Sequence, residues 1–225
     1  MKNLTLIIPA KNERESLPQV IKEIKDLDCK KKVILTKDDI ETINAIKHLD
    51  VEILYQTDRG YGDALISGIN TLDTDYFCIF NADGSFDPSE LPSMINLLEK
   101  SEFDFVFASR YQNNSGSEDD TFITWIGNRI FTLLGKIFFK LPITDIHYTY
   151  VLGKTNKAKE LELSQKNFNL CVELPIKAKR KNMKITSCSS YERKRIAGIK
   201  KVEAFRDGLT ILMYMIKLFF TNNNR

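Results

Sequence analysis

Short apolar segments alternate with helical patterns from residue 4 to residue 108, and this alternation constrains the fold more than any other feature. Apolar runs bounded by turn residues predict strands at 4–8, 32–35, 51–55, 76–80 and 103–108. Between them, apolar residues recur at helical spacing in 17–27, 40–49, 63–72 and 91–100. Strands that alternate with helices of about ten residues form βαβ units. The sequence therefore predicts an α/β fold with a mostly parallel central sheet flanked by helices.

Size, charge and cysteine usage narrow the class of protein. A chain of 225 residues with 43% hydrophobic residues can fill the core of one large domain. The formal net charge of +3 gives no electrostatic argument for nucleic acid as a partner, and none is expected. The four cysteines are widely spaced and the two histidines isolated, which predicts neither a zinc site nor a disulfide framework. The N-terminus has no signal-peptide pattern, so the expected location is cytoplasmic.

The apolar run 76–80 ends in a polar cluster that suits a bound cation. The residues that follow are Asn81, Asp83, Gly84, Ser85, Asp87 and Pro88. In an open α/β sheet, ligands bind outside the carboxyl ends of the strands. An acidic cluster at that place can hold a divalent cation, and the cation can bind a diphosphate. The alternative is an ordinary strand followed by a turn, because the same residue types are common in turns.

The second half of the chain combines apolar helices with basic residues. Segment 121–141 is strongly apolar, and its Arg129, Lys136 and Lys140 fall in one narrow sector of a helical wheel. This pattern fits a helix in a membrane interface, but it equally fits amphipathic helices packed on the sheet. Segment 209–220 is nearly all apolar but shorter than the ~20 residues that span a bilayer. Ten lysines and arginines between residues 177 and 201 suit a phosphate-bearing ligand or an anionic membrane, or form a solvated basic face.

Three motifs follow one another at the ends of predicted strands. They are Ile8-Pro-Ala-Lys-Asn-Glu13, Asn81-Ala-Asp-Gly-Ser-Phe-Asp-Pro88 and Ala108-Ser-Arg-Tyr111. In their order and spacing they resemble the opening motif, the metal motif and the following strand end of the inverting family 2 glycosyltransferases of the GT-A fold. Within the family, the chain resembles the dolichyl-phosphate mannose synthase-like branch at Gly127-Asn128, Thr144-Asp145 and Arg195-Ile-Ala-Gly-Ile-Lys-Lys201. The resemblance extends from about residue 3 to residue 215.

This resemblance implies a GT-A nucleotide-diphospho-sugar transferase fold with C-terminal amphipathic helices. Residues 1–112 would form the nucleotide-sugar-binding half, 113–204 the acceptor-side half, and 205–225 an apolar helix with a polar tail. The implied activity is transfer of a sugar, of the hexosyltransferase type, from a nucleotide-diphosphate donor to a polyprenyl phosphate or a cell-surface glycan. Mg²⁺ or Mn²⁺ would be the cofactor. The protein would lie on the inner face of the cell membrane, and nothing is implied about its oligomeric state.

The resemblance also assigns roles to individual residues. Asp83, with Ser85, would hold the cation, whereas Arg195 would hold the diphosphate or the acceptor phosphate, and Glu173 would orient the acceptor; Asp83, Glu173 and Arg195 form the expected catalytic set. The expected substrate-binding residues are Pro9, Ala10, Glu13, Asp38, Asp39, Arg59, Asn81, Ala82, Arg110 and Lys201. For Glu13, Arg110 and Glu173, a structural role is the open alternative. A phosphate nucleophile is already ionised and needs no strong base, whereas a hydroxyl acceptor would need one.

Four segments depart from the family pattern. Where the family has Asp-Asp-Gly-Ser after the second strand, this chain has Leu35-Thr-Lys-Asp-Asp-Ile40, and where the family has Gly-Lys-Gly it has Gly60-Tyr61-Gly62. Asn81 replaces the first aspartate of the metal motif. Ile146-His-Tyr-Thr-Tyr150 replaces a Gly-rich stretch that contains an arginine. These changes keep a second hypothesis open, a catalytically weakened relative that acts as a binding or scaffold subunit in glycan assembly. A third, a nucleotidyltransferase, is disfavoured because the opening motif lacks the Gly-rich loop of such enzymes.

Overall fold

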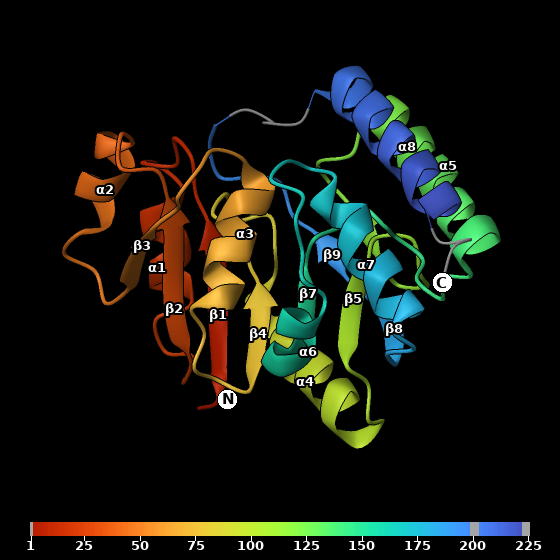
Figure 1. Ribbon diagram of the computed structural model, residues 1–225. Helices are drawn as coiled ribbons and strands as arrows, with labels where there is room; N and C mark the ends of the chain where they lie inside the picture. Colours follow the sequence, from red (N-terminus) through yellow and green to blue (C-terminus); the bar gives the residue numbers. More distant parts are fainter. Residues whose placement is uncertain (1, 199–202, 222–225) are drawn as a thin grey trace.

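The computed structural model describes residues 2–198 and 203–221. At its centre is a seven-stranded sheet in the order β3-β2-β1-β4-β7-β5-β8 (Figure 1). These strands are β1 (Leu4–Pro9), β2 (Lys30–Leu35), β3 (Glu52–Tyr55), β4 (Tyr76–Ile79), β5 (Phe105–Ser109), β7 (Val151–Lys154) and β8 (Ile185–Ser189). The short strands β6 (Gly116–Ser117) and β9 (Tyr191–Glu192) pair with each other in a second sheet. The predicted α/β class is confirmed.

Strand β7 is the exception in an otherwise parallel sheet, since it runs antiparallel to both of its neighbours, β4 and β5. Cys78 of β4 lies opposite Leu152, and Phe107 of β5 lies opposite Val151. Because β7 runs the opposite way, it begins at the edge of the sheet where β4 and β5 end. The segment 144–150 that precedes β7 therefore lies at the edge where ligands are expected. The sequence pattern does not predict β7, because Val-Leu-Gly-Lys is too short to show a strand periodicity.

Four helices connect the first five strands and cover both faces of the sheet. They are α1 (Leu17–Glu23), α2 (Ile40–Ile46), α3 (Tyr61–Asn70) and α4 (Leu91–Lys100), the last preceded by the 3-10 turn η1 (Pro88–Glu90). In β1, Leu6 and Ile8 join one core cluster while Ile7 joins the other, as expected for a strand buried on both faces. The helices α1 and α2 end earlier than predicted. Leu27 and Leu49 still pack on the core beyond their ends, which explains why the apolar spacing continues there.

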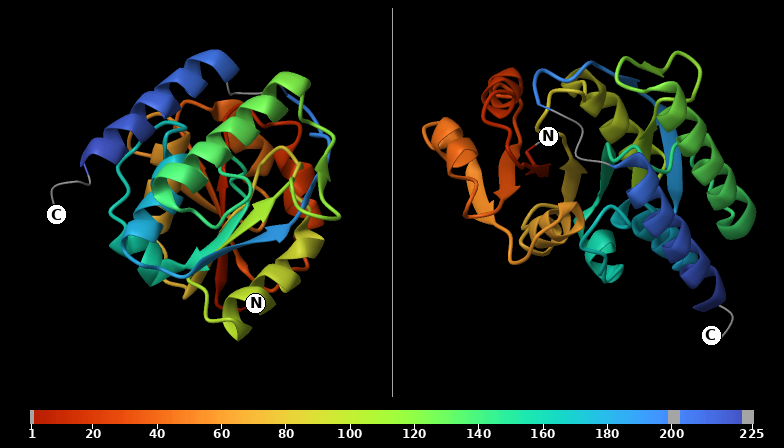
Figure 2. Two further views of the ribbon diagram at one scale, coloured as in Figure 1. Left: turned by 90° about the vertical axis from the view of Figure 1, so that its right-hand side faces the viewer. Right: turned by 90° about the horizontal axis from the view of Figure 1, so that it is seen from above.

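Two long helices, α5 (Phe122–Phe139) and α8 (Ala204–Thr221), lie side by side at one end of the molecule (Figure 2). The ring centres of Phe138 and Phe219 are 5.4 Å apart. Ile211 belongs to the buried core, and the partly buried Phe131 packs against that core. The remaining described helices are α6 (Thr155–Glu160) and α7 (Leu170–Arg180), which lie between β7 and β8 in the sequence. The prediction of packed amphipathic helices thus holds for the inner sides. Of the described helices, α5 alone is long and apolar enough, by length and composition, to cross a membrane.

Candidate active site

A cavity of about 1030 Å³ opens at the edge where the parallel strands end and β7 begins. Most of the residues predicted for the site line this cavity, namely Pro9, Ala10, Glu13, Asp38, Asp39, Arg59, Asn81, Ala82, Asp83, Arg110 and Arg195. They come from the loops after β1 to β5 and from the segment after β9, and the sheet order brings them together. Ser85 and Glu173 do not line the cavity. Lys201 lies outside the described residues.

Hydrogen bonds link the loops that follow β1 and β2, and both loops line the cavity. The carboxylate of Asp39 accepts hydrogen bonds from the backbone N–H of Asn12, at 2.7 Å, and of Thr42, at 3.3 Å. The second of these bonds caps the N-terminus of α2. The backbone N–H of Glu13 donates to the hydroxyl of Thr42 at 2.9 Å, and the carboxylate of Glu13 accepts from Ser16 at 2.5 Å. Asp39 therefore fixes the shape of the cavity floor, with its carboxylate already engaged by backbone groups.

The cavity is also lined by an exposed ion pair and by an aromatic stack, both involving residues at or just before the start of α3. Arg59 lies 2.9 Å from Asp38, and both side chains are mainly in solvent. Tyr61, which stands where the family pattern has a lysine, stacks on Phe168 with ring centres 5.2 Å apart. Its hydroxyl lies 2.7 Å from that of Thr149. Tyr61 thus joins α3 to the segment before β7, a packing role for which a lysine would be unsuited.

Asp83 is the acidic group of the metal motif that reaches the cavity. Its Oδ1 accepts a hydrogen bond from the N–H of Ser85 at 3.0 Å, and its Oδ2 lies 3.8 Å from Nη1 of Arg195. The amide of Asn81 donates to the hydroxyl of Ser85 at 3.2 Å. Ser85 is only 1% exposed, so its hydroxyl supports the motif from below instead of facing the cavity. The predicted metal ligands are therefore separated, with Asp83 in the cavity wall and Ser85 beneath it.

The segment after β9 lies across the metal motif and delivers Arg195. The backbone N–H of Arg193 donates to the carbonyl of Ser85 at 2.9 Å, and that of Ile196 to the carbonyl of Asp83 at 2.8 Å. The guanidinium of Arg195 then binds Asp119, with Nη2 2.8 Å from Oδ2. Arg195 therefore bridges two carboxylates, one from the motif after β4 and one from the loop 113–120. Arg195 thus lies beside Asp83, and its role toward a phosphate stays a prediction.

Arg110 lies in a buried network of carboxylates. It donates to both oxygens of Asp145, at 2.7 and 3.1 Å, and to Glu192 at 3.1 Å, while Asp120 is 3.6 Å away. The guanidinium also stacks over Tyr148, 4.7 Å from the ring centre. Burial raises the pKa of Glu192, although Arg110 lies beside it. With its donors engaged in this way, Arg110 is placed to hold the site together, and the structural alternative fits it better than contact with substrate.

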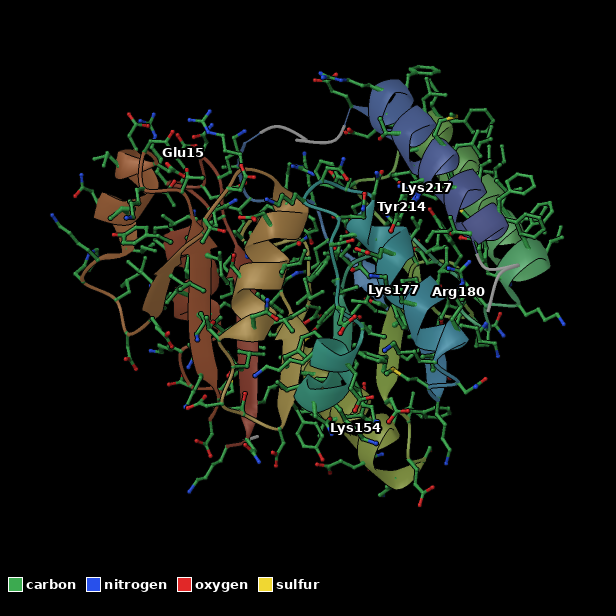
Figure 3. The ribbon with its side chains drawn as sticks, in the orientation of Figure 1. Glu15, Lys154, Lys177, Arg180, Tyr214 and Lys217 are labelled. Carbon is green, nitrogen blue, oxygen red and sulfur yellow. The ribbon has the colours of Figure 1, made fainter. Side chains whose placement is uncertain are left out.

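Glu173 is fully buried outside the cavity. Its carboxylate accepts hydrogen bonds from the backbone N–H of Ser164 and of Gln165, at 3.0 and 2.9 Å, and pairs with Lys177 at 2.8 Å. The hydroxyl of Tyr214, which lies beside α7 in Figure 3, donates to it at 3.2 Å. Burial disfavours the charged form, but the donors around it outweigh burial and lower the pKa of Glu173. Its geometry indicates a residue that positions a loop and α8, and not one that touches the acceptor.

The cavity changes character along its length. Beyond the polar end, its walls are made of apolar side chains from α5 and α8, including Ile123, Phe131, Leu209 and Leu212. The sequence predicts both helices as amphipathic, but it does not show that their inner sides face each other across a cavity. His147 also lines the cavity and is missing from the predicted site. Its place two residues after Asp145, in a stretch that departs from the family pattern, is the signal that could have identified it.

The residues present allow a cation site that substrate would complete. Within 2–198 and 203–221, no cluster of three or more His, Cys, Asp or Glu side chains could hold a metal ion by itself. Mg²⁺ commonly binds one or two carboxylates together with substrate phosphates and water. Asp83 fits that arrangement as a single carboxylate at the cavity wall. A protein cage is therefore absent from the described residues, and a site shared with a diphosphate is chemically reasonable.

Known proteins are similar to this chain in sequence and in fold. The family described as "Glycosyl transferase family 2" matches residues 5–161. The low-salt glycan biosynthesis hexosyltransferase Agl6 of Haloferax volcanii is 22% identical over 220 residues, covering 95% of this chain and 53% of its own length. The undecaprenyl-phosphate mannosyltransferase of Micrococcus luteus is 26% identical over 203 residues, covering 82% of this chain and 81% of its own. The chain thus spans about half the length of the Haloferax relative.

Among solved structures, the crystal structure of glucosyl-3-phosphoglycerate synthase from Mycobacterium tuberculosis, with Mn²⁺, UDP and phosphoglyceric acid, is similar at a TM-score of 0.74. The sequence identity is 14%, and the match covers 97% of this chain and 78% of that one. This similarity confirms the expected GT-A fold. The family match covers more than half of the chain and agrees with the motifs that surround the cavity. The chain therefore belongs to glycosyl transferase family 2.

Proposed function

We propose that the protein transfers a sugar from a nucleotide-diphosphate donor to a polyprenyl phosphate at a membrane surface. The observation that carries this proposal is one continuous cavity that joins a polar end, at Asp83 and Arg195, to an apolar end between α5 and α8. A lipid-linked phosphate has the same two parts, a charged head and a hydrocarbon chain. A glycan acceptor would bring hydroxyl groups for which apolar walls offer no partners. The Micrococcus luteus relative, whose name specifies undecaprenyl phosphate, supports the same acceptor class.

The donor is proposed to bind with its diphosphate between Asp83 and Arg195 and its nucleotide over the loops after β1, β2 and β3. Negative charge develops on the nucleoside diphosphate as the bond between the sugar carbon and the diphosphate oxygen breaks. Preorganised positive groups stabilise such charge without rearranging during the reaction. The pairing with Asp119 holds the guanidinium of Arg195 in place beforehand. Arg195 is therefore the residue that we expect to stabilise the leaving group.

A divalent cation, Mg²⁺ or Mn²⁺, is proposed to bind between Asp83 and the diphosphate. When bound, it would neutralise charge on the leaving diphosphate. The similar synthase from Mycobacterium tuberculosis was crystallised with UDP and either Mn²⁺ or Mg²⁺, which supports this proposal. Asn81 takes the place of a second acidic residue and removes one negative charge. The protein is therefore expected to bind the cation weakly by itself and more tightly together with the nucleotide.

The acceptor is proposed to place its phosphate at the junction of the two ends of the cavity and its chain along Phe131 and Leu209. Both residues line the cavity, one from α5 and one from α8. A phosphate oxygen, already ionised at neutral pH, attacks the sugar carbon as the bond to the diphosphate breaks, so no general base is required. Attack opposite the leaving group inverts the configuration at that carbon. The products are the sugar-linked lipid phosphate and the nucleoside diphosphate.

An outer apolar face is proposed to rest on the membrane. We define it by exposed residues on α5, Phe122, Ile126, Ile130, Leu133 and Ile137, and on α8, Met213, Ile216 and Phe220, whose exposed fractions run from 37% to 76%. Contiguous apolar surface on this scale marks an interaction site. The exposed Arg129 and Lys136 on α5 can reach anionic headgroups beside it. Because nucleotide sugars are cytoplasmic substrates, we place the protein on the inner face of the cell membrane.

The first test is the binding of nucleotides to the folded protein. UDP, GDP, ADP, CDP and dTDP would be titrated by calorimetry with and without Mg²⁺ or Mn²⁺ against wild type and Asp83→Ala. We expect one nucleotide to bind in a cation-dependent way, with a loss of at least ~10-fold in affinity in the variant. Asp87→Asn is the matched control, since Asp87 belongs to the same motif but does not line the cavity. Transfer of labelled sugar to undecaprenyl phosphate in vesicles would then test the acceptor.

The scaffold-subunit hypothesis predicts the opposite result. Its supporting observation is Asn81, whose amide is used in a hydrogen bond to Ser85 and provides no charge for a cation. If circular dichroism shows a folded wild-type protein that binds none of these nucleotides, the transferase proposal fails. Binding that is equally strong in wild type and Asp83→Ala would reject the role of Asp83 but keep the nucleotide site.

A further inference from the structure

A chain of hydrogen bonds runs along one wall of the cavity from Asp120 to His147. The hydroxyl of Tyr111 lies 2.6 Å from Oδ2 of Asp120, and Nδ2 of Asn128 lies 3.0 Å from the same hydroxyl. Nδ1 of His147 lies 3.0 Å from Oδ1 of Asn128. Asp120, Asn128 and His147 all line the cavity. The hydrogen bonds thus link the loop 113–120 through α5 to the segment that precedes β7.

The direction of each hydrogen bond in this chain follows from its carboxylate end. An ionised carboxylate can only accept, so the hydroxyl of Tyr111 donates to Asp120 and its oxygen accepts from the amide of Asn128. That orients the carbonyl oxygen of Asn128 toward His147, where it can only accept. Nδ1 of His147 must therefore carry the proton. In the neutral ring, the other nitrogen, Nε2, is then an unprotonated acceptor.

Nε2 of His147 is buried and has no hydrogen-bond partner among the described residues. Burial, together with the positive charge of Arg110, lowers the pKa of His147 to about 4, so the ring is neutral at physiological pH. A buried acceptor without a partner destabilises the folded protein, because it has lost its hydrogen bonds to water and gained none in return. His147 lines the cavity, but Nε2 itself is closed to solvent, so a ligand bound in the cavity can donate a hydrogen bond to it once the neighbouring side chains move slightly aside. The missing partner is therefore a hydrogen-bond donor.

The position of His147 in the cavity selects the kind of donor. Its ring lies against Phe131 of α5, with ring centres 4.8 Å apart, so it stands beside the apolar end. In the proposed reaction, the transferred sugar and the acceptor phosphate meet at this junction. The ionised phosphate has oxygens that only accept, and the hydrocarbon chain has no polar group. A sugar hydroxyl is the group that can donate here.

We propose that Nε2 of His147 accepts a hydrogen bond from a hydroxyl group of the transferred sugar, which makes His147 a specificity-determining residue for the donor. This inference rests on the proposed function and adds the substrate group that the site recognises, a sugar hydroxyl. It assigns Asp120, Tyr111 and Asn128 as positioning residues that hold His147 in the tautomer with a bare Nε2. Sites built to bind a hydroxyl discriminate against analogues that lack it, because the buried partner is then left unpaired.

The tautomer can be observed directly by NMR of protein with ¹⁵N-labelled histidine. The chain contains two histidines, His48 and His147, and a His48→Gln variant assigns the signals. We expect the Nδ1–H tautomer of His147 and an unprotonated Nε2. Addition of the nucleotide sugar should shift the Nε2 signal toward that of a hydrogen-bonded nitrogen, while the nucleoside diphosphate alone should not. An Nε2–H tautomer, or a signal that no bound nucleotide sugar moves, would overturn the proposal.

Kinetics with deoxy donors provide the second test. His147→Phe should lower kcat/KM for the natural donor roughly 10- to 100-fold, the effect of one lost hydrogen bond to a buried group, and leave the Kd of the nucleoside diphosphate unchanged. The monodeoxy donor that lacks the contacting hydroxyl should show the same loss with wild type and no further loss with the variant. His147→Gln, whose amide oxygen can accept, should recover part of the activity.

The outcomes separate this inference from the function on which it rests. If a nucleotide binds through Asp83 but His147→Phe is equally impaired with every monodeoxy donor, the role of His147 is wrong and the transferase proposal stands. If no nucleotide or nucleotide sugar binds to the folded wild type, both fail. If His147→Phe does not fold, the NMR titration of the wild type decides, because it requires no substitution at His147.

Discussion

His147 should make the stability of the protein depend on pH in a defined window. In the folded protein the pKa of His147 is about 4, below the ordinary value of about 6.5. Between these two pH values, His147 is protonated in the unfolded chain and neutral in the folded chain. The stability that comes from keeping His147 neutral in the folded protein is fully present above pH 6.5 and is lost as the pH falls toward 4. Between pH 7 and pH 5 this amounts to about 2 kcal/mol of unfolding free energy.

The measurement is urea unfolding of wild type and His147→Gln at both pH values. Carboxylates elsewhere titrate in the two proteins alike, so the difference between them isolates the histidine. We expect wild type to lose about 2 kcal/mol more than the variant between pH 7 and pH 5. Equal losses would show that the folded His147 takes up its proton at an ordinary pH.

Gly84 is the residue of the metal motif whose backbone tolerates least change. Its φ is +82°, a conformation that favours glycine, and a Cβ added there would lie 2.5 Å from the side chain of Ile196. Gly84→Ala should destabilise the protein by about 1–2 kcal/mol and push the segment that carries Arg195 away from Asp83. Nucleotide affinity should fall about 10-fold as one charged contact weakens. Gly127→Ala, with open space around its Cβ inside helix α5, is the control and should stabilise the protein slightly, because alanine is the better helix former.

For single residues, residue type and motif order predict many of the side chains around the cavity, although they wrongly add Ser85 and Glu173 and miss His147. They do not predict what each side chain touches. Asp83 and Arg195 stand together as expected. Arg110 was expected to bind substrate as one of two alternatives, and the sequence cannot show that Asp145 and Glu192, 35 and 82 residues further on, take up its donors. Such partners depend on tertiary packing. The unpaired nitrogen of His147 is invisible for the same reason.

Among the elements, α7 and α8 are joined through one buried carboxylate. Glu173→Gln would place amide hydrogens against the N–H groups of Ser164 and Gln165, which now donate to the carboxylate. We expect a loss of about 3 kcal/mol in the free energy of unfolding, measured with urea. Tyr214→Phe, which removes a single donor at 3.2 Å, should cost less than about 1 kcal/mol. Comparable losses in the two variants would contradict this account of the carboxylate.

The regular elements were predictable where their periodicity is long or their apolar run is uninterrupted. Helix α4 has its predicted bounds, and β1 to β5 lie where apolar runs predict them. The exceptions are informative. Strand β7 is short and contains Gly153, against which Phe77 and Phe105 pack closely, so it depends on its neighbours and not on its own pattern. The helical periodicity of α5 was clear, but the division of its surface between core and solvent required the position of α8.

As a whole, the molecule is expected to bind membranes through the outer apolar face. Replacing Phe122, Ile130 and Ile137 together by serine should reduce partitioning onto phosphatidylglycerol vesicles by at least about 100-fold, because each side chain contributes up to about 1.5–3 kcal/mol on burial. Cosedimentation with vesicles provides the measurement. Ile40→Ser is the control, since Ile40 is 56% exposed but lies on α2. If the triple variant partitions like wild type, the face does not contact lipid.

The antiparallel strand β7 also governs the order in which the chain can assemble during synthesis. When residues 1–112 have left the ribosome, β1 to β4 can pair, but β5 cannot, because its partners are β7 and β8. The open edge of β4 stays unpaired until residues 151–154 have been synthesised. Arg110 likewise has no carboxylate partner from these later segments until Asp145 and then Glu192 have been synthesised. The edge of the sheet that carries the cavity is therefore completed last. A chain that terminates early keeps an unpaired strand and is prone to aggregate, so it does not form a smaller enzyme.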